Sequence, residues 1–156
     1  MTASQPFVHA STLPFGLPDF AAFQPAHYPP AFEAGMAEVL AELDAVAADP
    51  EPATAENVLD AWESAGQLLD RALTAFFVTK AVDTNDELDA IEAEYAPKLA
   101  QHADEIFLNR AHYDRLRALA DRAASGAVVL DAEQRWLLDD LMAAFVRAGV
   151  ALPEAD

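Results

Sequence analysis

The chain has 156 residues, no cysteine, and a formal net charge of −18 at pH 7 that comes from 27 acidic and 9 basic side chains. A chain of this length suits one soluble domain that buries roughly 70% of the surface of its unfolded state. The negative charge argues against binding to nucleic acid or to an anionic membrane surface. The absence of cysteine excludes disulfides and thiolate zinc sites, and it fits a cytoplasmic location.

The first 29 residues are predicted to form an extended arm. Five of the ten prolines lie in this segment, and they prevent a continuous helix. The arm also carries adhesive aromatic side chains, among them Phe7, Phe15, Phe20 and Phe23. We expect the arm to pack over its own domain, and a tail that binds a partner is the alternative.

Residues 30–156 are predicted to form a helical domain that begins with two long helices. The first should run from Pro30 to about Asp49, because apolar residues recur at helical spacing up to that point. The second should begin after Thr54 as its N-cap and continue to about Phe77 along one broad apolar stripe. A stripe of that width predicts that the second helix is buried along its length.

The third helix is predicted from Thr84 to about Ile106. Thr84 and Glu87 fit a capping box at its start. Pro97 lies inside the helix, where proline removes one backbone hydrogen bond and clashes with the preceding turn. We therefore expect the helix to kink or divide near Ala96.

The last two predicted helices are capped by Asn109 and Asp131. An extended link at 127–130 separates them, and Gly149 suits the left-handed stop of the fifth helix. Residues 152–156 look like the first turn of a further helix. Together the elements predict an all-α, bundle-like domain of about five helices, preceded by the arm.

Histidine spacing indicates no metal site, because no two of the four histidines, at positions 9, 27, 102 and 112, lie three or four residues apart. A ligand set of His102 with Asp104 or Glu105 is conceivable, but a hydrogen-bonded core histidine is the favoured interpretation of His102. His27 is predicted to fix a turn of the arm. The histidines at 9 and 112 are predicted to be solvated.

Acidic residues crowd the third predicted helix, but they share one solvent environment, whereas acid–base catalysis needs two carboxyls in different environments. A solvated face is therefore predicted for Asp86, Glu87, Asp89, Glu92 and Glu94. The two tryptophans, Trp62 and Trp136, are predicted to be core anchors. No nucleophile elbow, phosphate loop or calcium loop is recognisable, so the sequence offers no candidate for a catalytic, cofactor-binding or metal-ligating residue.

Five segments carry a resemblance to a known family. They are Leu17–Met36, Asn57–Arg71, Thr84–Leu88 (Thr-Asn-Asp-Glu-Leu), Ile106–Asn109 (Ile-Phe-Leu-Asn) and Phe145–Gly149 (Phe-Val-Arg-Ala-Gly). Over about Ser11 to Asp156 the chain resembles the N-terminal helical region of the thimet oligopeptidase and peptidyl-dipeptidase family of zinc metallopeptidases. The run Thr84–Leu88 and the ending Ala148-Gly149 look closer to the bacterial peptidyl-dipeptidase branch than to the broader oligopeptidase branch.

The resemblance implies an N-terminal fragment of a longer enzyme. Members of the family carry a His-Glu-x-x-His helix far downstream, in which two histidines bind zinc and the glutamate activates the metal-bound water. This pentapeptide does not occur in the 156 residues, so we expect the isolated chain to hold no zinc and to cleave no peptides. The implied partners are the catalytic region of the same polypeptide and the short peptides that enter a channel between the two regions.

Composition also permits an alternative from another class. A stand-alone acidic helical module could bind a partner protein through its arm and one apolar helix face. The two hypotheses differ in what lies beyond Asp156, because only the peptidase hypothesis predicts a downstream zinc motif.

Overall fold

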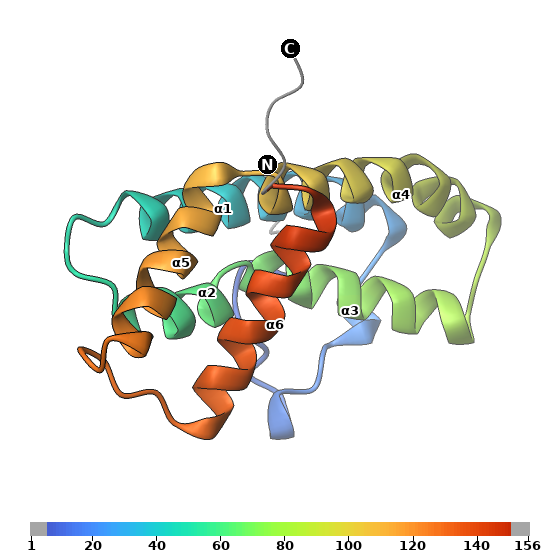
Figure 1. Cartoon of the computed structure of the whole chain (residues 1–156). Helices are drawn as coiled ribbons and strands as arrows, with labels where there is room; N and C mark the ends of the chain where they lie inside the picture. Colours follow the sequence, from blue (N-terminus) through green and yellow to red (C-terminus); the bar gives the residue numbers. More distant parts are fainter. Residues whose placement is uncertain (1–5, 151–156) are drawn as a thin grey trace, which may run out of the picture. The chain divides into compact units, whose positions relative to one another are not determined.

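The structure is a computed structural model that describes residues 6–150. The described residues form helices and turns without a strand, which confirms the all-α prediction (Figure 1). The helical turn predicted at 152–156 lies outside the described residues. No helix in the described range is both long and apolar enough to cross a membrane.

The chain divides into two compact units, each built from two separate stretches. The first unit comprises Met1–Val39 and Gly66–Ala100, and the second comprises Leu40–Ala65 and Gln101–Asp156. Helices α1 (Tyr28–Ala48) and α4 (Asp86–Phe107) each contribute residues to both units.

The first unit holds the arm, the first part of α1, helix α3 (Gln67–Val82) and most of α4. Three short 3₁₀ turns shape the arm: η1 (Pro14–Gly16), η2 (Phe20–Ala22) and η3 (Pro25–His27). The helices meet around edge-to-face aromatic rings, with centroid distances of 5.1 Å for Tyr28–Phe76, 5.4 Å for Phe32–Phe76 and 5.2 Å for Phe32–Tyr95. Aromatic pairs at such distances add roughly 0.5–1.5 kcal/mol each beyond their burial.

The arm packs partly on this aromatic core. Phe7 is buried, and its ring lies 4.6 Å from that of Phe23 and 5.4 Å from that of Tyr28. The expectation that the arm packs over its own domain is therefore correct for Phe7. It is wrong for Phe15, which is 98% exposed.

The second unit contains η4 (Ala55–Asp60), α2 (Ala61–Ser64), α5 (Arg110–Ala124) and α6 (Ala132–Ala148). η4 is a single π-helical turn that leads directly into α2. Buried side chains of η4, α5 and α6 form one core, whose members include Val58, Leu59, Leu116, Leu119 and Phe145. The ring of Trp62 packs edge-on against Phe145 at 5.7 Å, so Trp62 is the core anchor that was predicted.

Most of the predicted helix ends are confirmed by side-chain caps. Asn57 N donates to Thr54 Oγ1, Ala111 N donates to Asn109 Oδ1, and Gln134 N donates to Asp131 Oδ1. Gly149 has a φ of 105°, as the left-handed stop requires. One cap was misplaced: Leu88 N donates to Asn85 Oδ1, and Thr84 Oγ1 instead donates to Asp89.

Two other expectations are wrong, and the expected kink or division of the third helix is wrong as to the division. The second predicted helix is interrupted at Gly66, whose φ of 78° is left-handed, so the chain turns before α3 begins. Helix α4 is not divided at Pro97, and because Pro97 and Ala93 are both exposed, water can reach the carbonyl that the proline leaves without a partner. Trp136 is 67% exposed on α6 and anchors no core.

Candidate functional site

The four histidines take four different environments. His27 fixes a turn as predicted, since Gln24 N donates to its Nδ1 at 3.2 Å, and His9 is exposed. His112 was predicted to be solvated but is 1% exposed, with Nε2 2.9 Å from Asp44 Oδ1 and Nδ1 3.4 Å from Ile106 O. Its place on the inner face of α5, one turn before Leu116, was the signal that the prediction missed.

His102 is buried as predicted, but the predicted hydrogen bond is wrong. Neither ring nitrogen has a hydrogen-bond partner among the described residues. Burial lowers the pKa of His102, and the nearby Glu105 opposes that shift. Within the described range no three side chains of the kinds that bind metal ions converge.

Three carboxylates of α4, those of Asp89, Glu92 and Glu94, are paired with lysines and not with one another. Lys80 Nζ lies 2.8 Å from Asp89 Oδ1 and 2.6 Å from Glu92 Oε2. Hydrogen bonds from Lys80 and then from Thr84 hold the pKa of Asp89 below its ordinary value. Carboxylates kept ionised in this way are poor proton donors at neutral pH, which agrees with a solvated face and not with an acid–base pair.

A second lysine ties α4 to α1 within the first unit. Lys98 Nζ donates to Glu33 Oε1 and to Glu94 Oε1, both at 2.9 Å, and Tyr95 OH donates to Glu33 Oε1 at 3.0 Å. The Lys98 and Tyr95 bonds hold the pKa of Glu33 below its ordinary value. These contacts neutralise part of the acidic surface and fix the two helices together.

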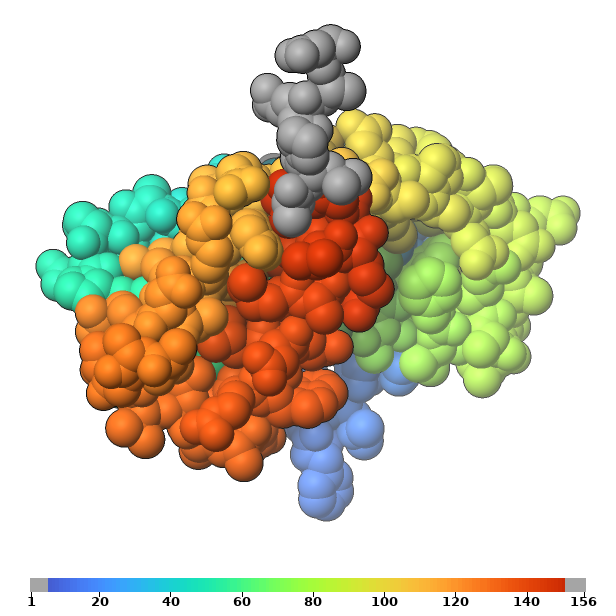
Figure 2. Space-filling model, in the orientation of Figure 1, coloured from blue at the N-terminus to red at the C-terminus, as the bar shows by residue number. Residues whose placement is uncertain are grey.

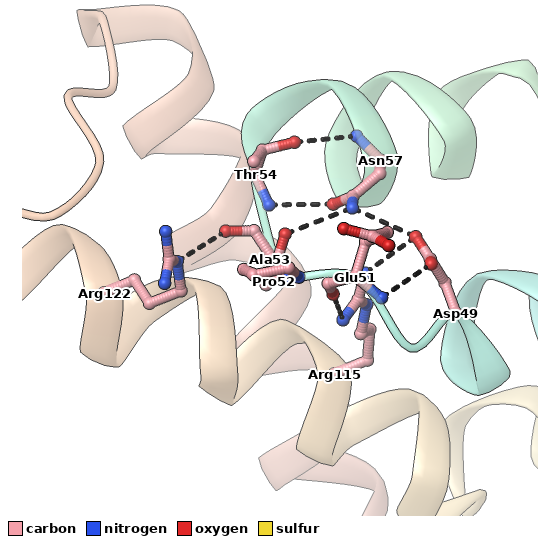
Figure 3. A network of polar contacts seen from close by, with 8 residues as sticks. All are labelled: Asp49, Glu51, Pro52, Ala53, Thr54, Asn57, Arg115 and Arg122. Carbon is pink, nitrogen blue, oxygen red and sulfur yellow. Dashed lines mark hydrogen bonds and ion pairs between the residues drawn. The ribbon is translucent and has the colours of Figure 1, made fainter.

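Two arginines of α5 hold the loop between α1 and η4 (Figure 3). Arg115 donates from Nη1 to Glu51 O at 2.9 Å and from Nη2 to Asp49 Oδ2 at 3.0 Å, and Arg122 donates from Nε to Ala53 O at 2.9 Å. The two arginines were not singled out from the sequence. Their spacing of seven residues, which places them on one face of a helix, was the available signal.

Asn57 completes this network from the other side of the loop (Figure 3). Its Nδ2 donates to Asp49 Oδ2 at 3.0 Å and to Pro52 O at 3.2 Å, while its Oδ1 accepts from Thr54 N at 2.8 Å. Three consecutive carbonyls of the loop, those of Glu51, Pro52 and Ala53, thereby accept hydrogen bonds from donors on two elements. This arrangement stabilises a loop and offers no nucleophile or base.

A cleft of about 380 Å³ lies between the arm and α3. Arg71 of α3 lines the cleft and fastens the arm, donating from Nε to Phe7 O at 2.9 Å and from Nη2 to Val8 O at 3.2 Å. Asp19 and Asp70 add carboxylates to walls that are otherwise largely apolar. The volume falls within the roughly 300–1,000 Å³ of small-ligand sites, which makes this cleft the candidate binding site of the described residues.

Ser11 lines the cleft and has a hydroxyl that could act as a nucleophile, but this hydroxyl already makes two hydrogen bonds. Ser11 Oγ donates to Leu17 O at 2.6 Å and accepts from Leu13 N at 3.2 Å. A serine needs an adjacent base to attack a substrate, and the hydroxyl proton is here directed to a carbonyl. Ser11 is therefore not arranged as a nucleophile.

Comparison with known proteins gives the family of the chain. No protein-family model matches it. It is 37% identical to the dipeptidyl carboxypeptidase of Escherichia coli (strain K12) over 156 residues, which is 100% of this chain and 23% of that protein. It is 34% identical over 154 residues, or 99% of its length, to the dipeptidyl carboxypeptidase of Salmonella typhimurium, of which it spans 22%. Over its whole length the chain therefore matches the N-terminal region of the dipeptidyl carboxypeptidases, the peptidyl-dipeptidase branch of the family that its sequence resembles.

Proposed function

We propose that the chain is the N-terminal helical domain of a zinc-dependent peptidyl-dipeptidase or oligopeptidase, and that it forms part of the wall of a channel for short peptides. The observation that carries this proposal is its 37% identity to the Escherichia coli dipeptidyl carboxypeptidase along all 156 residues. The chain spans less than a quarter of that relative. The zinc, the reacting groups and the main partner surface are accordingly proposed to lie in the rest of a longer cytoplasmic polypeptide.

Features of the described residues support a structural role. Several polar side chains are bound to one another: the carboxylates of Asp89 and Glu94 on α4 to lysines, and the arginines of α5 to carbonyls and a carboxylate of the loop before η4. Such pairing fixes helices and loops in place, as a channel wall requires. The isolated chain is proposed to bind no zinc and to have no peptidase activity.

A domain exchange tests the proposal. The matching first part of the Escherichia coli enzyme is replaced by this chain, and the release of dipeptides from a short peptide is compared among the chimera, the enzyme with that part deleted, and this chain alone. We expect no cleavage by the chain alone, strongly reduced cleavage by the deletion variant, and restored cleavage by the chimera. Sequencing the gene beyond Asp156 provides an independent check, because a His-Glu-x-x-His motif is expected there.

The opposite result would favour the alternative function. If the deletion variant cleaves short peptides as fast as the intact enzyme and shows no affinity for this chain in a titration, the channel-wall role is wrong. The stand-alone acidic helical interaction module would then be the better description.

A further inference from the structure

The middle of the arm forms a closed loop that presents apolar side chains to solvent. We define the arm tip as residues 11–17, which belong to the blue segment of Figure 2. Gly16 N donates to Leu13 O at 3.0 Å, and Ser11 Oγ bridges the two ends of the loop through Leu17 O and Leu13 N. Phe15 stands at the centre of the tip and is 98% exposed, and Leu13 and Leu17 beside it are also exposed.

The backbone holds Phe15 outward against a conformational cost. Phe15 has φ 63° and ψ 15°, the left-handed region, and no other non-glycine residue in the described range has a positive φ. For a bulky side chain that conformation costs about 1–2 kcal/mol. Since the ring gains no contact here in return, the strain points to a contact that the ring makes elsewhere.

The arm tip is also free of charge in a strongly acidic chain. Among the first 32 residues Asp19 is the one residue that contributes to the formal net charge of −18. Surfaces that become the centre of an interface are depleted in charged residues and enriched in aromatic ones. The arm tip has this composition, whereas α4 and α5 carry many charged side chains.

The size of the arm tip indicates what kind of partner it suits. Its three apolar side chains expose roughly 400 Å², given about 200 Å² for a fully exposed side chain of this size. Two separate molecules need about 800 Å² per partner for a stable complex, and two copies with a charge of −18 repel each other. A partner on the same polypeptide needs far less area, because its effective concentration is high.

We propose that the arm tip docks Phe15 into an apolar pocket on the part of the polypeptide that dipeptidyl carboxypeptidases have beyond the region matched here. That part makes up about three quarters of the relatives, of which this chain spans 23% and 22%. The inference rests on the proposed function and adds to it a specific contact. In this arrangement Arg71 fastens the arm to α3 just before the tip, through its bonds to Phe7 O and Val8 O.

Limited proteolysis of the domain-exchange chimera tests the docking. Subtilisin cleavage within 11–17 is followed by mass spectrometry in the chimera and in this chain alone, each with the natural Phe15 and with Phe15→Ser. Burial of one phenylalanine ring corresponds to a docking equilibrium that is about 10- to 100-fold more favourable. We expect Phe15→Ser to speed cleavage of the chimera by that factor and to leave cleavage of the isolated chain unchanged. Val129→Ser, at an apolar residue that is 90% exposed in the second unit, is the matched control and should have no effect.

The outcomes separate the inference from the proposed function. A chimera that releases dipeptides but whose arm tip is cleaved equally fast with and without Phe15 overturns the docking contact and leaves the proposed function standing. A chimera without activity, beside a deletion variant that is fully active, overturns both. If the isolated chain sediments as a dimer and Phe15→Ser makes it a monomer, the occupant is a second copy of the chain and the inference is wrong.

Discussion

Replacing Gly35 by alanine should destabilise the protein although alanine is the better helix former. Gly35 lies in α1, where α3 passes so closely that a Cβ atom would stand 2.8 Å from Leu69 Cα and 2.9 Å from Leu69 N and Cβ. Two of these three atoms belong to the backbone and cannot rotate away. The added methyl group must therefore push the two helices apart.

The net effect follows from two opposing terms. Overpacking of this kind costs about 1–3 kcal/mol, whereas alanine gains about 0.5–1 kcal/mol over glycine inside a helix. The expected net loss is about 1–2 kcal/mol. For a protein of this size each kcal/mol lowers Tm by about 2–4 °C, so Gly35→Ala should unfold about 2–8 °C below the parent protein.

Circular dichroism during heating measures both variants of a matched pair. The control is Ala34→Gly, one residue earlier in α1 and exposed, where only the helix propensity changes. Alanine should be the more stable residue at 34 and glycine the more stable one at 35. A higher Tm for Gly35→Ala than for the parent protein would refute the close approach of α1 and α3.

Three further predictions follow from buried or paired polar groups. His102→Leu should raise the free energy of unfolding by about 1–3 kcal/mol, because two unpartnered nitrogens leave the interior. Burial lowers the pKa of His102 in the folded state, so the parent protein should lose stability in urea titrations as pH falls below about 6.5. The variant should lack that loss. Arg115→Met should lower the free energy of unfolding in urea by about 2 kcal/mol, because it frees the loop before η4. Arg117→Met, at an exposed arginine on the same helix, should change it by less than about 0.5 kcal/mol. Equal effects of the two substitutions would contradict the role of Arg115 in holding the loop. The pKa of Asp89, measured by NMR, should lie below its ordinary value and should rise in Lys80→Met. The stability that this ion pair provides should be present at neutral pH and disappear as pH falls through the pKa of Asp89. If the pKa of Asp89 is unchanged in Lys80→Met, the ion pair does not form in solution.

Local signals in the sequence located most helices and their ends. Thr54, Asn109 and Asp131 were identified as caps because the capping interaction involves residues within three positions of one another. Gly149 was identified for the same reason, since a left-handed stop is a property of one residue. Gly66 carried an equally local signal, but the apolar stripe that continues on both sides of it concealed the break.

Features that depend on distant residues could not be predicted in this way. The burial of His112 depends on Asp44 and Trp62, which lie 68 and 50 positions earlier. The exposure of Trp136 depends on which face of α6 packs against the core, and helical periodicity alone does not determine that face. The cleft and the clamp of Arg71 likewise require the arm to return to α3, more than sixty residues along the chain.

The two units are interleaved along the sequence, and this has a consequence for synthesis on the ribosome. The chain supplies part of the first unit, then part of the second, then completes the first with Gly66–Ala100 before it returns to the second. The aromatic core around Phe32 and Phe76 therefore cannot form completely until Tyr95 has left the ribosome. Until then the segments that were synthesised earlier lack their packing partners. For the same reason any break between residues 40 and 100 divides both units at once. A nascent chain that stalls there would hold two incomplete cores and would be a substrate for chaperones or proteases.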